Sequence, residues 1–246
     1  MSNNKPIDYI ICEGPSDAEF VSLYIETLLG YQEDRNQAAR YVFSAIKSRF
    51  YYLVGPNRDA LVCSCGGCNN IERMYNNVVL PEIKGRGIES RVIVMIDRDN
   101  KTDNECYNLV PFSEVSLIIN NWINGSINGP FVSNGIPNTI RYRSYFSVIP
   151  ATSSGAFENV LIVSIYNNEY DIANEVTAFF SSLSAPARIH INTSRREIKA
   201  KLDTMIVLID PERIHSTLKD MFAVINLNDP NIVQNFSFLS DIVNNI

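Results

Sequence analysis

The chain has 246 residues, of which 46% are hydrophobic and 20% are charged, and its formal net charge is −6. This composition fits one large α/β domain, or a core domain with a helical appendage. The acidic balance argues against a protein that coats nucleic acid non-specifically, because such proteins are usually basic. No stretch approaches the ~20 apolar residues of a membrane span and no N-terminal signal pattern is present, so we expect a cytoplasmic protein with no membrane partner.

The first predicted strand covers residues 7–13, IDYIICE, an apolar run that ends on Glu13. Continuous apolar runs suit strands that are buried on both faces of a parallel sheet. Apolar residues at helical spacing then predict a helix over residues 16–29, with Ser16 as its N-cap and Gly30 at its end.

The next segment is predicted as a helix over residues 37–53, followed by a turn at residues 54–59. A second strand is predicted at residues 60–65, ALVCSC, and a helix at residues 68–84 follows its Gly-Gly turn. The strand–turn–helix unit of the N-terminus therefore recurs.

The strongest strand signal is SRVIVMIDRD, residues 90–99, which ends in Asp97 and Asp99. A helix is predicted over residues 111–123, and residues 124–139 are predicted as a loop because they are rich in Asn, Gly and Pro.

A fourth strand is predicted at residues 141–150, and the helix after it is predicted to begin at Ser153 or Ser154. After about residue 170 the strand signals fade. The remaining predicted segments are all helical and cover residues 171–183, 195–209, 215–225 and 236–245.

Strand–helix alternation predicts an α/β fold of the Rossmann-like kind, with a central parallel sheet of about four strands and helices on both faces. We expect the core to span residues 5–170 and a helical C-terminal extension, residues 171–246, to pack on it.

One cysteine-rich segment, CSCGGC at residues 63–68, could be taken for half of a zinc site. A structural zinc ion needs four ligands, usually in two spaced pairs, and no second Cys or His pair follows at useful spacing. A buried strand, a tight turn and a helix start explain the segment better.

Acidic residues follow the predicted strands at one edge of the sheet. Glu13 ends the first strand, Asp97 and Asp99 end the third, and Glu158 lies in the first turn of the helix after the fourth. Sites in open parallel sheets form at the carboxyl ends of the strands. Each motif alone is also explained as a helix cap or a turn, but the combination is more specific.

A cation would relieve the repulsion among these acids. In Asp97-x-Asp99, alternation along an extended chain should point both side chains the same way, and Asp17 lies four residues after Glu13. Carboxylate oxygens are the ligands that Mg²⁺ prefers. Two ions about 4 Å apart would activate a water and stabilise a leaving oxygen in phosphodiester cleavage.

The segments IICEGPSDAEF and VIVMIDRDN together resemble the Toprim family, the metal-binding catalytic domains of topoisomerases, bacterial primases and nucleases of the overcoming-lysogenization-defect (OLD) type. Further segments, GGCNNIERM, GAFENVLI and KAKLDTM, are similar to compact stand-alone Toprim proteins close to the OLD nucleases, including uncharacterised domain families. The resemblance covers about residues 6–170 and reaches the helical tail only loosely.

The resemblance implies that Glu13, Asp97 and Asp99 are catalytic metal ligands and that Asp17 and Glu158 also bind metal. Glu13 and Asp17 would hold one Mg²⁺ or Mn²⁺ ion, and the other three acids a second. Ser153 or Ser154 is a further candidate ligand. Bases that could neutralise the substrate phosphate, or supply the catalytic lysine, are Arg98, Arg143, Lys199 and Lys201.

Two departures from the family limit what the resemblance implies. Topoisomerases and primases usually carry a Gly soon after Asp-x-Asp, and DRDNKTD has none. OLD nucleases place a Lys just after their late acid, whereas Asn159 follows Glu158, so Lys199 or Lys201 is the candidate instead. The segment RREIKAK is equally explained as the solvated face of a helix.

The leading hypothesis is therefore a metal-dependent nuclease that cuts DNA, or less readily RNA, as an anti-phage or DNA-processing effector. The alternative is a regulatory Toprim subunit that works with a separate ATPase, since the chain has no GxxxxGK[ST] loop. A second copy of the chain, forming a homodimer, is a further candidate partner. A third interpretation is a flavodoxin-like or receiver-like domain, but the order of the acids in this sequence fits such a domain poorly.

Overall fold

A computed structural model describes residues 5–44, 48–110, 116–133, 136–211 and 218–241 of the chain. One mixed sheet of seven strands forms its centre, in the order β2-β3-β4-β1-β5-β7-β6. The strands are β1 (Ile7–Cys12), β2 (Gln32–Glu33), β3 (Arg49–Val54), β4 (Asp59–Ser64), β5 (Ser90–Asp97), β6 (Trp122–Ser133) and β7 (Ile136–Ile149).

The four predicted strands correspond to β1, β4, β5 and β7, which are the parallel strands at the centre of the sheet. The expected number of about four strands is wrong for the whole sheet. At one edge β3 is antiparallel to β4 and carries the short β2, and at the other edge β6 is antiparallel to β7.

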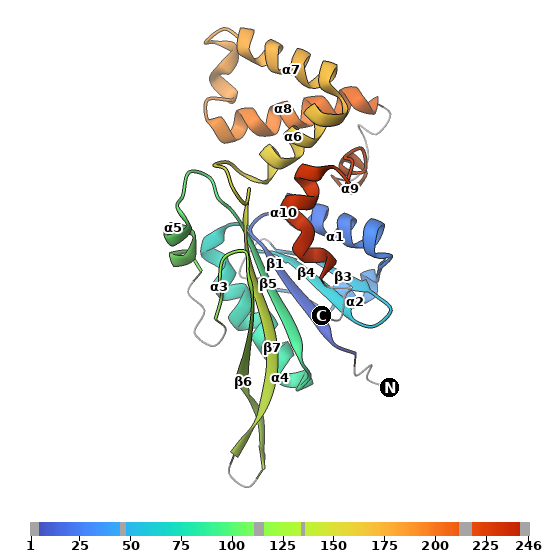
Figure 1. The fold of residues 1–246 in the computed structure, drawn as a ribbon, viewed down its shortest axis with the longest axis vertical. Coiled ribbons are helices and arrows are strands. Elements are labelled where there is room, and N and C mark those ends of the chain that lie inside the picture. The colour runs from blue at the N-terminus through green and yellow to red at the C-terminus, as the bar shows by residue number, and fades with distance from the viewer. Residues whose placement is uncertain (1–4, 45–47, 111–115, 134–135, 212–217, 242–246) are drawn as a thin grey trace.

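Helices cover both faces of this sheet (Figure 1). One face packs against α1, α6 and α10, and the other against the segment from α3 to α4. The helical elements are α1 (Pro15–Leu29), α2 (Arg35–Ala38), η1 (Cys68–Asn70), α3 (Ile71–Met74), η2 (Tyr75–Val79), α4 (Leu80–Arg86), α5 (Asp103–Asn108), α6 (Phe157–Asn168), α7 (Tyr170–Ser182), η3 (Ala187–His190), α8 (Ser194–Ile209), α9 (Leu218–Phe222) and α10 (Pro230–Ser240).

The continuous apolar run of β1 is explained by this double cover. Ile10 and Cys12 belong to the core on the α1 face, whereas Tyr9 and Ile11 belong to the core on the α3–α4 face. Since successive residues of a strand point to opposite faces, both sets must be apolar when both faces are buried. The predicted α/β class with helices on both faces is confirmed.

Three predicted elements differ from the structure. The helix predicted over residues 37–53 is wrong in the described part of this segment, because α2 ends at Ala38 and β3 occupies residues 49–54 as the antiparallel neighbour of β4. The predicted helix 111–123 lies partly outside the described residues, and β6 begins at Trp122 within its remainder. The predicted loop 124–139 is largely a hairpin, β6–β7, which projects beyond the sheet at the lower end of Figure 1.

The caps also differ from prediction, and this affects the edge where the acids lie. Helix α1 has Gly14 rather than Ser16 as its N-cap, with Pro15 as its first residue. Helix α6 has Ala156 as its N-cap rather than Ser153 or Ser154. The predicted stop of α1 at Gly30 is confirmed, since this glycine has the left-handed φ of 69° that ends many helices.

An aromatic cluster joins the last helices to the sheet. Phe20 of α1 lies 5.1 Å from Phe157 of α6 and 5.0 Å from Phe236 of α10, measured between ring centroids. Helices α7 and α8 lie beyond α6, at the upper end of Figure 1. No helix in the described part of the chain is both long and apolar enough to cross a membrane.

Candidate metal centre

The carboxyl ends of β1 and β5 bring two of the predicted acids together. The two strands are parallel neighbours, and Glu13 follows β1 while Asp97 ends β5. The backbone N–H of Asp97 donates to Oε2 of Glu13 at 3.1 Å, and the backbone N–H of Glu13 donates to the carbonyl of Met95 at 3.0 Å. The acid at the end of β1 is therefore turned toward the neighbouring strand.

Asp99 connects the end of β5 to the segment that precedes α6. Its φ of 52° is left-handed, a conformation that Asp tolerates better than most residues. It exchanges two backbone hydrogen bonds with Gly155, of 2.5 and 2.7 Å. The expected alternation along one extended strand is wrong, because β5 ends at Asp97 and Asp99 is left-handed, but both carboxylates contact the same side chain, Arg195.

Glu158 is held at the same edge by a bond to the end of β5. The backbone N–H of Phe157, the first residue of α6, donates to Oδ1 of Asp97 at 2.8 Å. Glu158 follows directly and is 4% exposed, and its Oε2 atom is buried without a hydrogen-bond partner among the described residues.

Asp17 reaches the cluster from the first turn of α1. Its Oδ2 atom accepts a hydrogen bond of 2.8 Å from the backbone N–H of Gly14, so it caps its helix, and it is 5% exposed. Burial, and then the charges of Asp97, Glu158 and Glu13, raise the pKa of Asp17 well above its ordinary value. The capping role and a place among the acids are thus compatible.

The surroundings also raise the pKa values of Asp97 and Glu13. Burial, and then the carboxylates of Glu13 and Glu158, raise the pKa of Asp97 to about 6, against the opposing influence of the Phe157 N–H and Arg195. Burial and the charge of Asp99 raise the pKa of Glu13. The five carboxylates therefore interact electrostatically, although they come from segments up to about 140 residues apart.

Three cations partly balance the cluster. Arg195 of α8 lies with Nη2 2.5 Å from Oδ2 of Asp97 and with Nη1 3.5 Å from Oδ1 of Asp99. Lys101 Nζ is 2.5 Å from Oδ2 of Asp99. Lys199, also of α8, is 3.1 Å from Oε1 of Glu158.

The donor chemistry of the cluster fits a hard divalent cation, since it offers carboxylate oxygens and one of them, Oε2 of Glu158, has no hydrogen-bond partner. As the side chains are placed, however, the described residues contain no group of three His, Cys, Asp or Glu side chains arranged to hold a metal ion. The observed counter-ions of Asp97, Asp99 and Glu158 are basic side chains.

Four other predicted site residues lie apart from the acids. Arg98 donates to the carbonyls of Pro150 and Ala151 and pairs with Asp103, so it ties the end of β5 to its surroundings. Lys201 pairs with Glu197 one turn earlier in α8. Ser153 is exposed in the bend before α6.

Arg143 is the fourth of these residues. It lies over the ring of Trp122 at 5.0 Å, and its strand position pairs with Arg91 near the start of β5. It lies six positions along β7 from Ile149, the partner of Asp97, which is about 20 Å at 3.3 Å per residue. A direct part for Arg143 at the acid cluster is therefore excluded by its place in the sheet.

Sequence reasoning missed Arg195, Lys101 and Asp203. Asp203 lies two turns after Arg195 on α8, and with Glu158 and Lys199 it lines a small cavity of about 140 Å³. Helical spacing could have indicated Arg195 and Asp203, because positions 195, 199 and 203 share one face of α8. Nothing in the sequence says that this face meets the strand ends.

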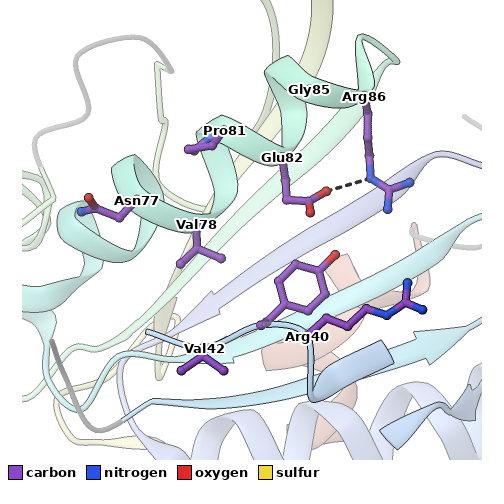
Figure 2. A pocket seen from close by; sticks show the side chains of 9 residues that line it. Arg40, Val42, Asn77, Val78, Pro81, Glu82, Gly85 and Arg86 are labelled. Atoms are coloured by element: carbon purple, nitrogen blue, oxygen red, sulfur yellow. Dashed lines mark hydrogen bonds and ion pairs between the residues drawn. The ribbon is translucent and has the colours of Figure 1, made fainter. Parts of the chain in front are cut away.

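A second hollow, of about 440 Å³, lies between α3–α4 and the segment after α2, on the opposite side of the sheet from α1 (Figure 2). Arg40 and Asn77 approach it from its two walls. Its one carboxylate, Glu82, is 2.9 Å from the guanidinium of Arg86. This hollow therefore lacks the group of acids that a cation site requires.

Comparison with known proteins adds little to this description. No family model matches the chain, and no curated protein matches it. The chain is similar to the crystal structure of a hypothetical protein from Pyrococcus horikoshii OT3, with 17% identity and a TM-score of 0.48 over 97% of this chain and 99% of that one. A likeness this distant says nothing of activity, so the site must be interpreted from its own residues.

Proposed function

We propose that the chain is a divalent-metal-dependent nuclease with a Toprim-like metal centre, acting on phosphodiester bonds of DNA or, less readily, RNA. The observation that carries the proposal is the gathering of Glu13, Asp17, Asp97, Asp99 and Glu158 at one edge of the sheet, with raised pKa values at three of them and a buried, unpartnered oxygen on Glu158.

The carboxylates would hold one or two Mg²⁺ or Mn²⁺ ions, which supply a polarised water and charge neutralisation for phosphodiester hydrolysis. The chain's own residues have distinct parts around them. Asp97 is oriented by the Phe157 N–H, and Glu13 by the Asp97 N–H. Lys199, close to Glu158, is the lysine placed to neutralise a phosphate or carry a proton.

Incubation of the purified chain with supercoiled plasmid and Mn²⁺ or Mg²⁺ tests this function. Glu13→Gln and Asp97→Asn should each abolish nicking, because each removes one charge from the centre. Asp103→Asn is the matched control, since Asp103 pairs with Arg98 and is largely exposed. Calorimetric titration with Mn²⁺ should show binding that Asp97→Asn weakens and Asp103→Asn leaves unchanged. A wild-type chain that binds no Mn²⁺ would refute the proposal.

A second candidate function is a regulatory subunit that acts with a separate ATPase. One observation favours it. Basic side chains already form ion pairs with Asp97, Asp99 and Glu158, and the described residues contain no group of three His, Cys, Asp or Glu side chains arranged to hold a metal ion. A chain of this kind would cut neither DNA nor RNA by itself, whether or not it binds Mn²⁺. Cleavage that appears only after a partner is added would favour this alternative.

A further inference from the structure

Helix α8 presents one face to the acid cluster. Arg195 lies in its first turn and Lys199 one turn later, and they reach different acids, Asp97 with Asp99 in the first case and Glu158 in the second. The side chain of Arg195 remains 44% exposed, so its guanidinium lies between the buried carboxylate of Asp97 and solvent, beside the half-buried Asp99.

The oxygens of Asp97 and Asp99 are all engaged in this arrangement. Oδ1 of Asp97 accepts from the Phe157 N–H and Oδ2 contacts Arg195. Oδ1 of Asp99 faces Arg195 and Oδ2 contacts Lys101. A divalent ion that bound these two acids would compete with Arg195 for the same atoms, and its charge would repel the guanidinium.

A displaced Arg195 would remain at the mouth of the site, because its backbone is fixed in the first turn of α8. That turn is capped by Thr193, whose side chain accepts a hydrogen bond from the N–H of Arg196. A guanidinium offers paired donors that match two oxygens of a phosphate as well as those of a carboxylate. The same side chain can therefore serve two anions in turn.

We propose that Arg195 binds the substrate's phosphodiester group: it neutralises Asp97 and Asp99 in the metal-free chain and transfers to a nucleic-acid phosphate when divalent ions take those carboxylates. This inference rests on the proposed nuclease function. Arg195 would supply a contact to the substrate phosphate at the acid cluster. Arg98 and Arg143 do not supply this contact, because Arg98 donates to the carbonyl of Pro150 and Arg143 lies over the ring of Trp122.

The test compares Arg195→Gln with Arg196→Gln. Arg196 is the matched control, because it is the adjacent arginine on α8. Within the described part of the chain, its guanidinium contacts the nearby Asn192 side chain at 3.4 Å and none of the acids of the cluster. Two quantities are measured for each chain: the affinity for Mn²⁺ by calorimetry, and the affinity for a short fluorescein-labelled DNA duplex by anisotropy in Ca²⁺. Thermal unfolding in EDTA checks that each variant is folded.

Arg195→Gln should bind Mn²⁺ several-fold more tightly than wild type, because a competitor is removed. It should bind the duplex about tenfold more weakly in Ca²⁺, the loss expected for one charge-assisted hydrogen bond. Arg195→Lys should recover part of the duplex affinity, since it restores the charge without the paired donors. Arg196→Gln should change neither affinity.

The outcomes separate this inference from the function on which it rests. If wild type and Arg195→Gln bind Mn²⁺ equally, and the duplex equally, Arg195 has no part in the exchange and the inference is overturned while the metal centre stands. If neither chain binds Mn²⁺, the proposed function fails and the inference fails with it. Equal loss of duplex affinity in both arginine variants would also overturn the inference, because it would indicate a general effect of charge.

Discussion

Replacing Asp97 by Asn should stabilise the metal-free chain at alkaline pH, although it removes an ion pair. Burial and the neighbouring acids raise the pKa of Asp97 from its ordinary 3.8 to about 6, even with Arg195 present. At ~1.4 kcal/mol for each pKa unit, ionising this buried carboxylate costs the folded state about 3 kcal/mol at pH 8. Asn carries no charge, and its Oδ1 can still accept the Phe157 N–H.

The size of this stabilisation depends on pH. A raised carboxyl pKa means that the folded chain binds the proton more tightly than the unfolded chain, so wild type loses stability as pH rises from about 4 through about 6. Asp97→Asn lacks this loss. Its advantage should reach up to about 3 kcal/mol at pH 8 and shrink to less than about 1 kcal/mol at pH 4, where Asp97 is protonated in the folded chain and only partly ionised in the unfolded chain.

Urea unfolding in EDTA at pH 4 and pH 8 measures the effect, with Asp103→Asn as the control that should show little change at either pH. Repeating the pH 8 titration with Mn²⁺ should stabilise wild type and leave Asp97→Asn nearly unchanged. If metal-free Asp97→Asn is less stable than wild type at pH 8, the Asp97–Arg195 pair outweighs the repulsion among the acids. The acid cluster would then be stable without added cations, contrary to our expectation.

Three other substitutions test separate parts of the molecule. Lys199→Gln should lower plasmid nicking at least about tenfold. Lys201→Gln, which removes an ion pair with Glu197 and a contact with the Phe180 ring, should leave nicking unchanged, and equal effects of the two substitutions would contradict a special role for Lys199. Phe236→Ala should lower the urea unfolding free energy by about 3–5 kcal/mol, because its ring packs in the cluster around Phe20; a loss below about 1 kcal/mol would contradict that packing. Tyr9→Phe should raise the free energy of unfolding by about 1 kcal/mol, because the Tyr9 hydroxyl is buried without a hydrogen-bond partner in the described structure. A lower melting temperature of this variant would mean that the hydroxyl does make a stabilising bond.

The central parallel strands β1, β4 and β5 could be predicted because every residue in them is buried and most are apolar, as expected of strands covered on both faces. The edge strands could not. In β3 the aromatic residues of RFYYLV fit a helical period as well as a strand. In β6 the Asn and Gly residues that predicted a loop lie in a strand that is paired on one side only, where a weak strand former is tolerated.

The acids of the candidate site could be predicted for a related reason. Parallel neighbours end at the same edge, so Glu13 and Asp97 had to lie close together once β1 and β5 were recognised. Their counter-ions had no such constraint. Arg195 is separated from Asp97 by 98 residues of chain, and only the packing of α8 against α6 and α7 brings it to the strand ends.

Within α8, helix phase distinguishes the two candidate lysines. Lys199 lies one turn after Arg195 and shares its face, whereas Lys201 is turned away and pairs with Glu197. The sequence could have distinguished the two lysines if one residue of the helix had been known to contact the acids. Without Arg195 as that known contact, both lysines were equivalent candidates.

The predicted domain boundary near residue 170 separates helices whose aromatic rings pack together, since Phe236 of α10 lies against Phe20 of α1. A chain shortened to that point would keep all five carboxylates but lose Arg195, Lys199 and the ring of Phe236 that lies against Phe20. Its strand ends would keep Lys101 but lose two of the three cations that balance the acids, and a face of the sheet would be opened to water. The N-terminal two thirds of this protein should therefore not be separable as a working fragment, and melting of the intact chain should follow a single transition in which the sheet and the late helices are lost together.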